Sequence, residues 1–145
     1  LVRFTAVRGN SVGRAIVTAC ILLSVCLTLF AQGGGSLGPP RGKTQRVRFA
    51  RGRTTAVLKG AVVRGTQDRY ILGARARQTM IVHITAREKN AVFTILGPDG
   101  TALPGTEEGV DATDWTGELP FSGDYSIWVS PSRGNATYTL EVTIR

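Results

Sequence analysis

An alternation of apolar and polar residues with a period of two restricts the fold of this chain more than any other feature. It runs through four segments, residues 69–74, 80–85, 125–130 and 138–145. In the third of these, Tyr125, Ile127 and Val129 alternate with two serines and a tryptophan. Successive side chains of a β-strand point to opposite faces, so this period is typical of half-buried strands. After residue 45, no segment has the apolar stripe of an amphipathic helix.

Residues that favour turns separate these runs at short intervals. They are Arg51-Gly52, Arg64-Gly65, Glu88-Lys89-Asn90, Pro98-Asp99-Gly100, Ser122-Gly123 and Arg133-Gly134-Asn135. Short, regularly spaced strands with one apolar face each bury that face by packing as two sheets. We therefore predict an all-β fold for residues 45–145, an antiparallel β-sandwich of about seven to nine strands that follows an N-terminal signal helix.

Residues 1–31 are predicted to be a signal peptide. Arg8 and Arg14 precede an uncharged, largely apolar stretch, residues 15–31, which ends at the small residue Ala31. A basic start, an apolar core and a small final residue are typical of a secretory signal that a peptidase removes. The alternative is a retained membrane anchor, although the stretch is at the short limit for spanning a bilayer. Export places the protein in the periplasm or outside the cell, with no stable membrane span after cleavage.

Residues 32–44 are rich in glycine and proline and are predicted to be a flexible linker. Both cysteines, Cys20 and Cys26, lie in the predicted signal peptide. After cleavage the chain therefore has no disulfide and no thiolate ligand for a metal. The stability of the domain must then come from its hydrophobic core.

The charge of the predicted mature chain is positive and unevenly distributed. From residue 32 onward the net charge is +5. Residues 41–89 carry 13 basic and two acidic side chains, whereas residues 99–124 carry seven acidic and no basic ones. Such asymmetry steers oppositely charged partners. Export disfavours nucleic acid as the partner. The remaining candidates are an anionic polymer of the cell envelope, lipid head groups and an acidic protein cleft. The alternative is that the basic residues only keep the surface solvated.

The sequence does not contain the usual sets of catalytic or metal-binding residues. His83, the one histidine, falls in a predicted strand on its more polar side, with no serine or cysteine nucleophile motif. A zinc site needs three or four clustered ligands. The acidic segment 107–114 lacks the glycine turn and the terminal glutamate of a calcium loop. We predict a non-enzymatic protein without cofactor or metal, with this segment as a solvated loop.

Trp128 is a candidate binding residue on a sheet surface. If Tyr125, Ile127 and Val129 face the core, Trp128 points away from it. Exposed tryptophans are frequent in binding surfaces because they bury a large area at a low cost in entropy. The alternative is that a neighbouring loop covers the ring.

Several motifs between Val47 and Ile144 resemble those of known exported β-sandwiches. They are Gly60 and Gly65, Asp68-Arg69-Tyr70, Ala76-Arg77-Gln78, Leu96-Gly97-Pro98-Asp99-Gly100, Leu119-Pro120-Phe121-Ser122-Gly123-Asp124-Tyr125 and Tyr138-Thr139-Leu140. One similar group is the pre-peptidase C-terminal domain of secreted bacterial proteases. The other is the periplasmic inhibitor of goose-type lysozyme. Because these are mostly turn and core residues, they predict the fold better than the function.

The resemblance to the inhibitors implies that loops at one end of the sandwich enter the lysozyme cleft. Arg133 and Ser132 occupy the corresponding loop, while Ser122 and Asp124 belong to the motif on the preceding turn. An arginine fork suits such a cleft because it pairs with a carboxylate through two hydrogen bonds. We therefore expect an exported binding module that uses these four residues and Trp128. The alternative is a binder of envelope glycan or anionic polymer that uses the basic residues from Arg46 to Arg77.

Overall fold

The computed structural model describes residues 41–145. The strands are β1 (Arg41–Arg46), β2 (Thr55–Val62), β3 (Gln67–Ala74), β4 (Thr79–Ala86), β5 (Ala91–Leu96), β6 (Asp114–Glu118), β7 (Gly123–Pro131) and β8 (Ala136–Ile144). The predicted signal peptide and most of the predicted linker lie outside the described residues. Within residues 41–145 no helix is long and apolar enough to cross a membrane.

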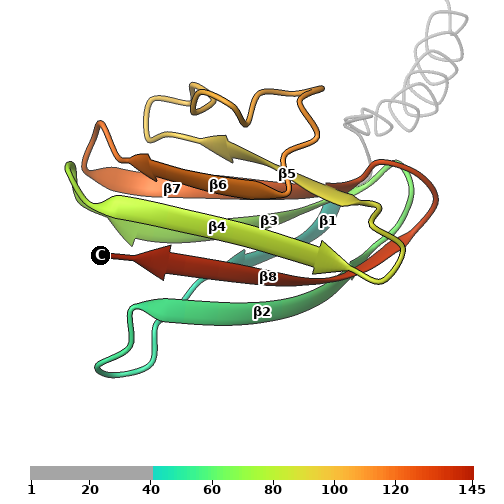
Figure 1. The fold of residues 1–145 in the computed structure, drawn as a ribbon, viewed down its shortest axis with the longest axis horizontal. Helices are drawn as coiled ribbons and strands as arrows, with labels where there is room; N and C mark the ends of the chain where they lie inside the picture. Colours follow the sequence, from blue (N-terminus) through green and yellow to red (C-terminus); the bar gives the residue numbers. More distant parts are fainter. Residues whose placement is uncertain (1–40) are drawn as a thin grey trace, which may run out of the picture. The chain divides into compact units, whose positions relative to one another are not determined.

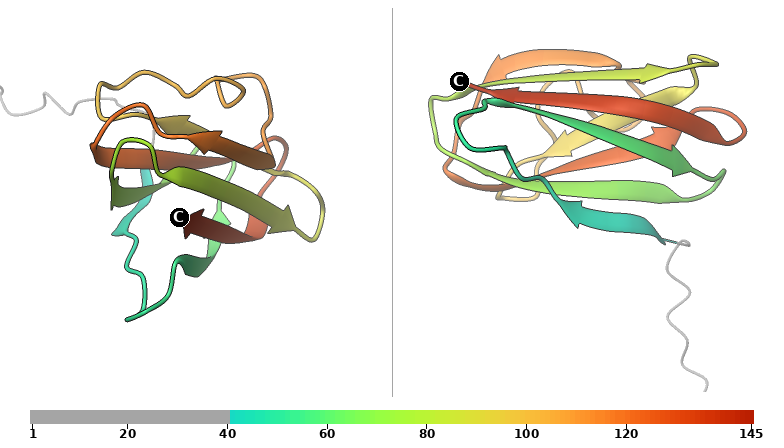
Figure 2. Two further views of the ribbon diagram at one scale, coloured as in Figure 1. Left: turned by 60° about the vertical axis from the view of Figure 1, so that its left-hand side comes forward. Right: turned by 90° about the horizontal axis from the view of Figure 1, so that it is seen from below.

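Two four-stranded sheets stack face to face (Figure 1). Sheet A has the strand order β1-β3-β7-β5, and sheet B has the order β2-β8-β4-β6. All paired strands are antiparallel except β1, which runs parallel to β3. Figure 2 shows the two layers from two further sides. The predicted all-β sandwich with seven to nine strands is thus confirmed.

The inward positions of the alternating segments form one core between the sheets. The largest fully buried side chains are Tyr70, Tyr125, Phe93, Leu72, Met80, Ile95, Leu119, Ile127, Leu140, Val62, Val82 and Val129. Burial of a large apolar side chain contributes about 1.5–3 kcal/mol. A core of this size explains how residues 41–145, which contain no cysteine, are stable without a disulfide.

Strand β1 differs from the expectation in both its start and its direction. The predicted linker extends to Thr44, whereas the strand already begins at Arg41. The segment Arg41–Arg46 contains no apolar side chain, so it lacks the alternation that marks the other strands. It is held at the sheet edge by pairing with β3 and by a hydrogen bond of 2.9 Å from the Lys43 amide to the buried Asp68 carboxyl.

A buried chain of polar groups links the two sheets. The Tyr138 hydroxyl of β8 donates to Asp68 Oδ2 of β3 at 2.5 Å, and the Tyr70 hydroxyl lies 2.8 Å from that of Tyr138. Because the proton of Tyr138 is directed to Asp68, Tyr70 is the donor in the second bond. Burial, together with these two hydrogen bonds, raises the pKa of Tyr138 far above its ordinary value. The hydroxyl therefore remains a donor at any pH at which the protein folds.

Gly60 of β2 makes room for the same hydroxyl. A Cβ atom at residue 60 would lie 2.4 Å from Tyr138 Oη, so the ring would have to move away from Asp68. We expect Gly60→Ala to lower the free energy of unfolding by about 1–3 kcal/mol in urea denaturation. Gly73→Ala is the control, because its Cβ would meet its nearest atom at an ordinary 3.5 Å. Equal stability of the two variants would contradict the close approach at Gly60.

Candidate binding site

Three connecting turns meet at one end of the sandwich, which we call the loop end. They are residues 63–66 between β2 and β3, residues 87–90 between β4 and β5, and residues 132–135 between β7 and β8. They lie on the right of Figure 1. Each turn has one residue with a positive φ, namely Gly65, Lys89 or Gly134. Such left-handed residues let a chain reverse its direction within a few residues.

The buried side chain of Asn90 fastens these turns together. Its amide group donates to the carbonyl oxygens of Arg133 and Asn135, both at 2.9 Å. The backbone carbonyl of Asn90 accepts from the Ser132 amide, also at 2.9 Å. The third turn joins through the Arg64 amide, which donates to the side chain of Asn135 at 2.9 Å. The sequence marks Asn90 only as a turn residue, because nothing local indicates contacts 43 and 45 residues away.

The loop end is exposed and positively charged. Arg64, Arg87, Lys89 and Arg133 are exposed there, with Glu88 as the one acidic residue of the three turns. An apolar side chain, Val63, is 57% exposed beside them. A protruding surface with excess positive charge and an apolar contact complements an acidic depression on a partner.

Arg133 and Ser132 are neighbours on the most exposed of the three turns. The Arg133 guanidinium donates from Nη2 to the Glu88 carbonyl oxygen at 3.0 Å, which orients the side chain across two turns. A guanidinium has five N–H donors, and this bond uses one of them. The geometry thus leaves a fork that suits bidentate pairing with a carboxylate.

Ser122 and Asp124 lie at the opposite end of the sandwich. Strand β7 separates them from Arg133 by about 25 Å, given the rise of an extended chain. The Ser122 hydroxyl accepts from the Ala76 amide at 2.9 Å. Asp124 forms a bidentate ion pair with Arg46, at 2.7 and 2.9 Å. These side chains join neighbouring segments of the fold, and the structure does not bring them to the surface that carries Arg133.

The Arg46–Asp124 pair predicts a dependence of stability on pH. The hydrogen bond from Arg46 lowers the pKa of Asp124 below its ordinary 3.8. A carboxyl whose pKa is lower in the folded state stabilises the fold above the unfolded pKa, and this contribution is lost as the pH falls through the folded value. We expect Asp124→Asn to lower the Tm at about pH 7, and this loss to shrink as the pH falls below 3.8. Asp111→Asn, at an exposed site, is the control; a loss for Asp124→Asn that does not change with pH would contradict the assignment to charge.

Trp128 lies at the centre of β7, on the outer face of sheet A. Ile127 and Val129 are fully buried, so the predicted outward direction of Trp128 is confirmed. The guanidinium of Arg69, on β3, lies 5.2 Å from the centre of the indole and donates to the Ser126 hydroxyl at 2.9 and 3.2 Å. These contacts fix the half-buried ring on the sheet.

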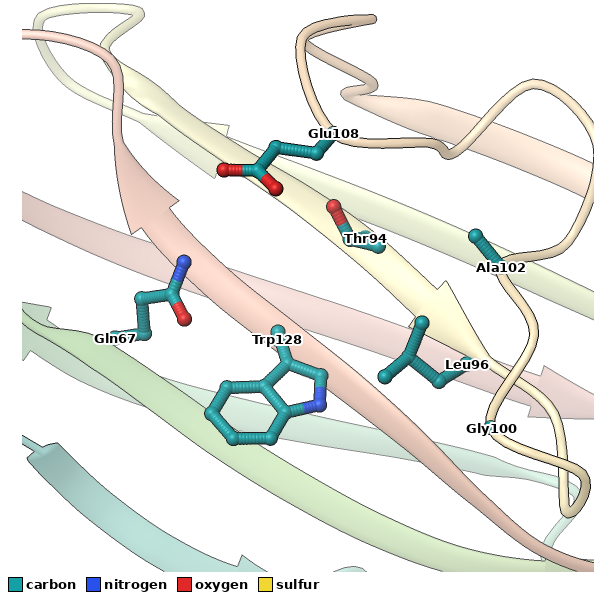
Figure 3. Close-up of a pocket in the computed structure, with 7 residues that line it drawn as sticks. All are labelled: Gln67, Thr94, Leu96, Gly100, Ala102, Glu108 and Trp128. Atoms are coloured by element: carbon teal, nitrogen blue, oxygen red, sulfur yellow. The ribbon is translucent and has the colours of Figure 1, made fainter. Parts of the chain in front are cut away.

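A cavity of about 380 Å³ opens beside this ring (Figure 3). It is lined by Gln67, Thr94, Leu96, Gly100, Ala102, Glu108 and Trp128. The segment that contributes Gly100, Ala102 and Glu108 connects β5 to β6 and folds back over β5. Part of the predicted solvated acidic loop therefore forms a wall of this cavity.

His83 lies on the outer face of sheet B. Its Nδ1 pairs with the Asp114 carboxylate of the neighbouring strand β6. The side chain is 44% exposed, as expected for a surface histidine. In the part of the chain that the structure describes, no group of three or more histidine, cysteine, aspartate or glutamate residues is placed to hold a metal ion.

A β-sandwich that presents a cluster of charged turns at one end has the architecture of a binding module. Its family follows from a solved structure, that of Aeromonas hydrophila PliG, a periplasmic lysozyme inhibitor of g-type lysozyme. The two chains are 35% identical, with a TM-score of 0.59, over 71% of this chain and 96% of the other. The chain belongs to the family of PliG, and the resemblance inferred from the sequence is confirmed.

Other solved structures share the fold at lower identity. Salmonella Typhimurium PliG is 24% identical over 72% of this chain and 99% of its own, with a TM-score of 0.58. The pre-peptidase C-terminal domain of a Bacillus anthracis collagenase is 13% identical over 74% of this chain and 99% of its own, with a TM-score of 0.53. No protein-family model and no curated protein sequence matches the chain.

Proposed function

We propose that this protein inhibits a goose-type lysozyme in the periplasm by inserting its loop end into the active-site cleft. The observation that carries this proposal is the position of Arg133, exposed on a turn that Asn90 holds to its neighbours. A pre-formed loop loses little conformational freedom on binding, so more of its contact energy contributes to affinity. The 35% identity to a periplasmic inhibitor of g-type lysozyme supports the same partner and compartment.

In this proposal, Arg133 is the central contact. Its guanidinium pairs with a carboxylate in the cleft, and Ser132 provides a neutral hydrogen-bonding group beside it. Arg64 and Lys89 surround this contact with further positive charge, which accelerates association more than it increases affinity. Ser122 and Asp124 support the fold and do not touch the partner.

The proposal is tested by measuring how the purified protein blocks cell-wall lysis by a goose-type lysozyme. We expect Arg133→Ala to weaken inhibition roughly 30-fold, the effect of losing a central interface residue worth about 2 kcal/mol. Arg145→Ala, which removes an exposed arginine, is the matched control and should inhibit like the wild type. The Tm of both variants should remain within a few degrees of the wild type. No inhibition by the wild type at micromolar concentration would refute the proposal.

The basic residues at the opposite end favour a second candidate function, binding of an anionic envelope polymer. Arg48, Arg51 and Arg53 precede β2, and Arg75 and Arg77 lie between β3 and β4; all five are exposed. By contrast, Arg46 and Arg69 are engaged by Asp124 and Ser126. The basic surface is therefore smaller than the whole stretch from Arg46 to Arg77.

This second candidate predicts retention on a heparin column that weakens as the salt concentration rises. We expect the triple variant Arg51→Gln, Arg53→Gln, Arg75→Gln to elute at a clearly lower salt concentration than the wild type. The matched control replaces three charges of the loop end, Arg64→Gln, Lys89→Gln and Arg133→Gln. Equal elution of the two triple variants would indicate that the net charge alone is responsible and would contradict a site at this end.

A further inference from the structure

The cavity beside Trp128 combines an apolar wall with hydrogen-bonding groups. Leu96 and Ala102 lie on the side of the cavity away from Gln67 (Figure 3). Gln67 Nε2 donates to the Ser130 hydroxyl at 3.0 Å, so this bond sets the orientation of the Gln67 amide. The carboxylate of Glu108 takes part in neither of the two ion pairs among residues 41–145.

These groups define the chemistry of a ligand. No arginine or lysine is among the lining residues, and a carboxylate is present, so phosphate and carboxylate ligands are disfavoured. The amide oxygen of Gln67 and the carboxylate of Glu108 accept hydrogen bonds, while the Thr94 hydroxyl both donates and accepts. A matching ligand has several hydroxyl donors and one apolar face. A volume of about 380 Å³ lies in the range of about 300–1,000 Å³ typical of small-molecule sites.

We propose that this cavity is a saccharide-binding site, in which a pyranose ring lies against Trp128. The C–H face of the ring packs on Leu96 and on the part of the indole that lines the cavity, while Arg69 lies over the indole ring. The sugar hydroxyls bond to Gln67, Thr94 and Glu108. None of the residues that line this cavity belongs to the three turns of the loop end, so the proposal does not depend on the proposed inhibition of lysozyme.

A second hollow extends the cavity toward the loop end. It has a volume of about 200 Å³ and shares Gln67, Thr94 and Glu108 with the first. Its further lining includes the hydroxyl groups of Ser130 and of Ser132, the latter on a turn of the loop end, and the carboxylates of Glu107 and Asp111. All four side chains can accept a hydrogen bond from a hydroxyl donor. Two connected hollows accommodate a linear oligosaccharide better than a single sugar, so we expect a trisaccharide to bind more tightly than its monosaccharide.

The Trp128 indole N–H is a built-in probe of this site. Nε1 of Trp128 is the one buried side-chain polar atom of residues 41–145 without a hydrogen-bond partner, whereas Nε1 of Trp115 donates to the Pro104 carbonyl at 3.0 Å. The two indole signals in an NMR spectrum of the labelled protein should therefore differ, and Trp115→Phe assigns them. Three trisaccharides serve as ligands: tri-N-acetylchitotriose, maltotriose and cellotriose.

We expect at least one trisaccharide to shift the Trp128 signal with a Kd of about 1–10 mM, while the Trp115 signal stays in place. Trp128→Ala should abolish binding, as measured by calorimetry, and Glu108→Gln should weaken it about 3–10-fold through loss of the charged acceptor. The matched control Glu118→Gln, at an exposed residue of β6, should bind like the wild type. Glu108→Gln should leave lysozyme inhibition unchanged, so failure here is distinguishable from failure of the proposed function.

Two outcomes would overturn the proposal. One is the absence of any Trp128 shift with all three trisaccharides at about 20 mM, well above the expected Kd. The other is a shift by N-acetyl-lysine amide that is stronger than any saccharide shift and is suppressed by salt. That result would assign the cavity to a cationic group held by Glu108.

Discussion

Asp68→Ala is expected to lower the free energy of unfolding by about 3–4 kcal/mol, a large share of the 5–15 kcal/mol typical of a domain. Asp68 is 2% exposed and accepts two hydrogen bonds, from the Lys43 amide of β1 and the Tyr138 hydroxyl of β8. Alanine removes both acceptors and leaves two donors without their partner. Urea denaturation at neutral pH measures the loss.

Two milder variants separate the contributions of this network. Tyr138→Phe keeps the bond from Lys43 to Asp68 and removes only the hydroxyl, so we expect about half the loss of Asp68→Ala. Asp68→Asn keeps one oxygen for Lys43 and should fall between Asp68→Ala and the wild type. If Asp68→Ala were within about 1 kcal/mol of the wild type, the bond to β1 would contribute little to the attachment of that strand.

The same residue shows why most of the fold, but not all of it, follows from the sequence. Strands whose inner face is apolar, such as β7 and β8, are visible as an alternation because burial itself produces the pattern. Strand β1 has no apolar side chain and is attached through a carboxyl 25 residues further along the chain. No local pattern encodes a contact of that kind, so the sequence interpretation left residues 41–44 in the linker.

The candidate site, too, can be predicted only in part from the sequence. Exposure of Arg133 follows from its place in a Gly-Asn turn between two strong strands, and the resemblance to the inhibitors directs attention to it. The hydrogen-bond partners of Arg133 do not follow from the sequence, because Glu88 and Asn90 lie 45 and 43 residues away in the chain. Asp124 pairs with Arg46 over 78 residues, which no spacing in the sequence reveals. Residues that a resemblance assigns to one binding site therefore do not all lie at one surface.

Tyr125→Ala is the second change with a large expected effect, about 3–5 kcal/mol of unfolding free energy. The ring is fully buried in the core. Its hydroxyl donates to the Phe121 carbonyl at 2.7 Å and accepts from the Phe121 amide at 3.2 Å, which closes the turn before β7. Alanine leaves a cavity in the core and two backbone groups without their partner. Denaturation in urea, followed by tryptophan fluorescence, measures the loss.

Tyr125→Phe tests whether the motif of residues 119–125 acts on the fold or on a partner. It keeps the buried ring and removes the two bonds to Phe121, so we expect a loss of about 1–2 kcal/mol. The motif lies at the end of β7 away from Arg133. Well below its Tm, the variant should therefore inhibit lysozyme like the wild type. Weaker inhibition at unchanged stability would instead place this turn in the interface, and the loop end would then be only part of the binding surface.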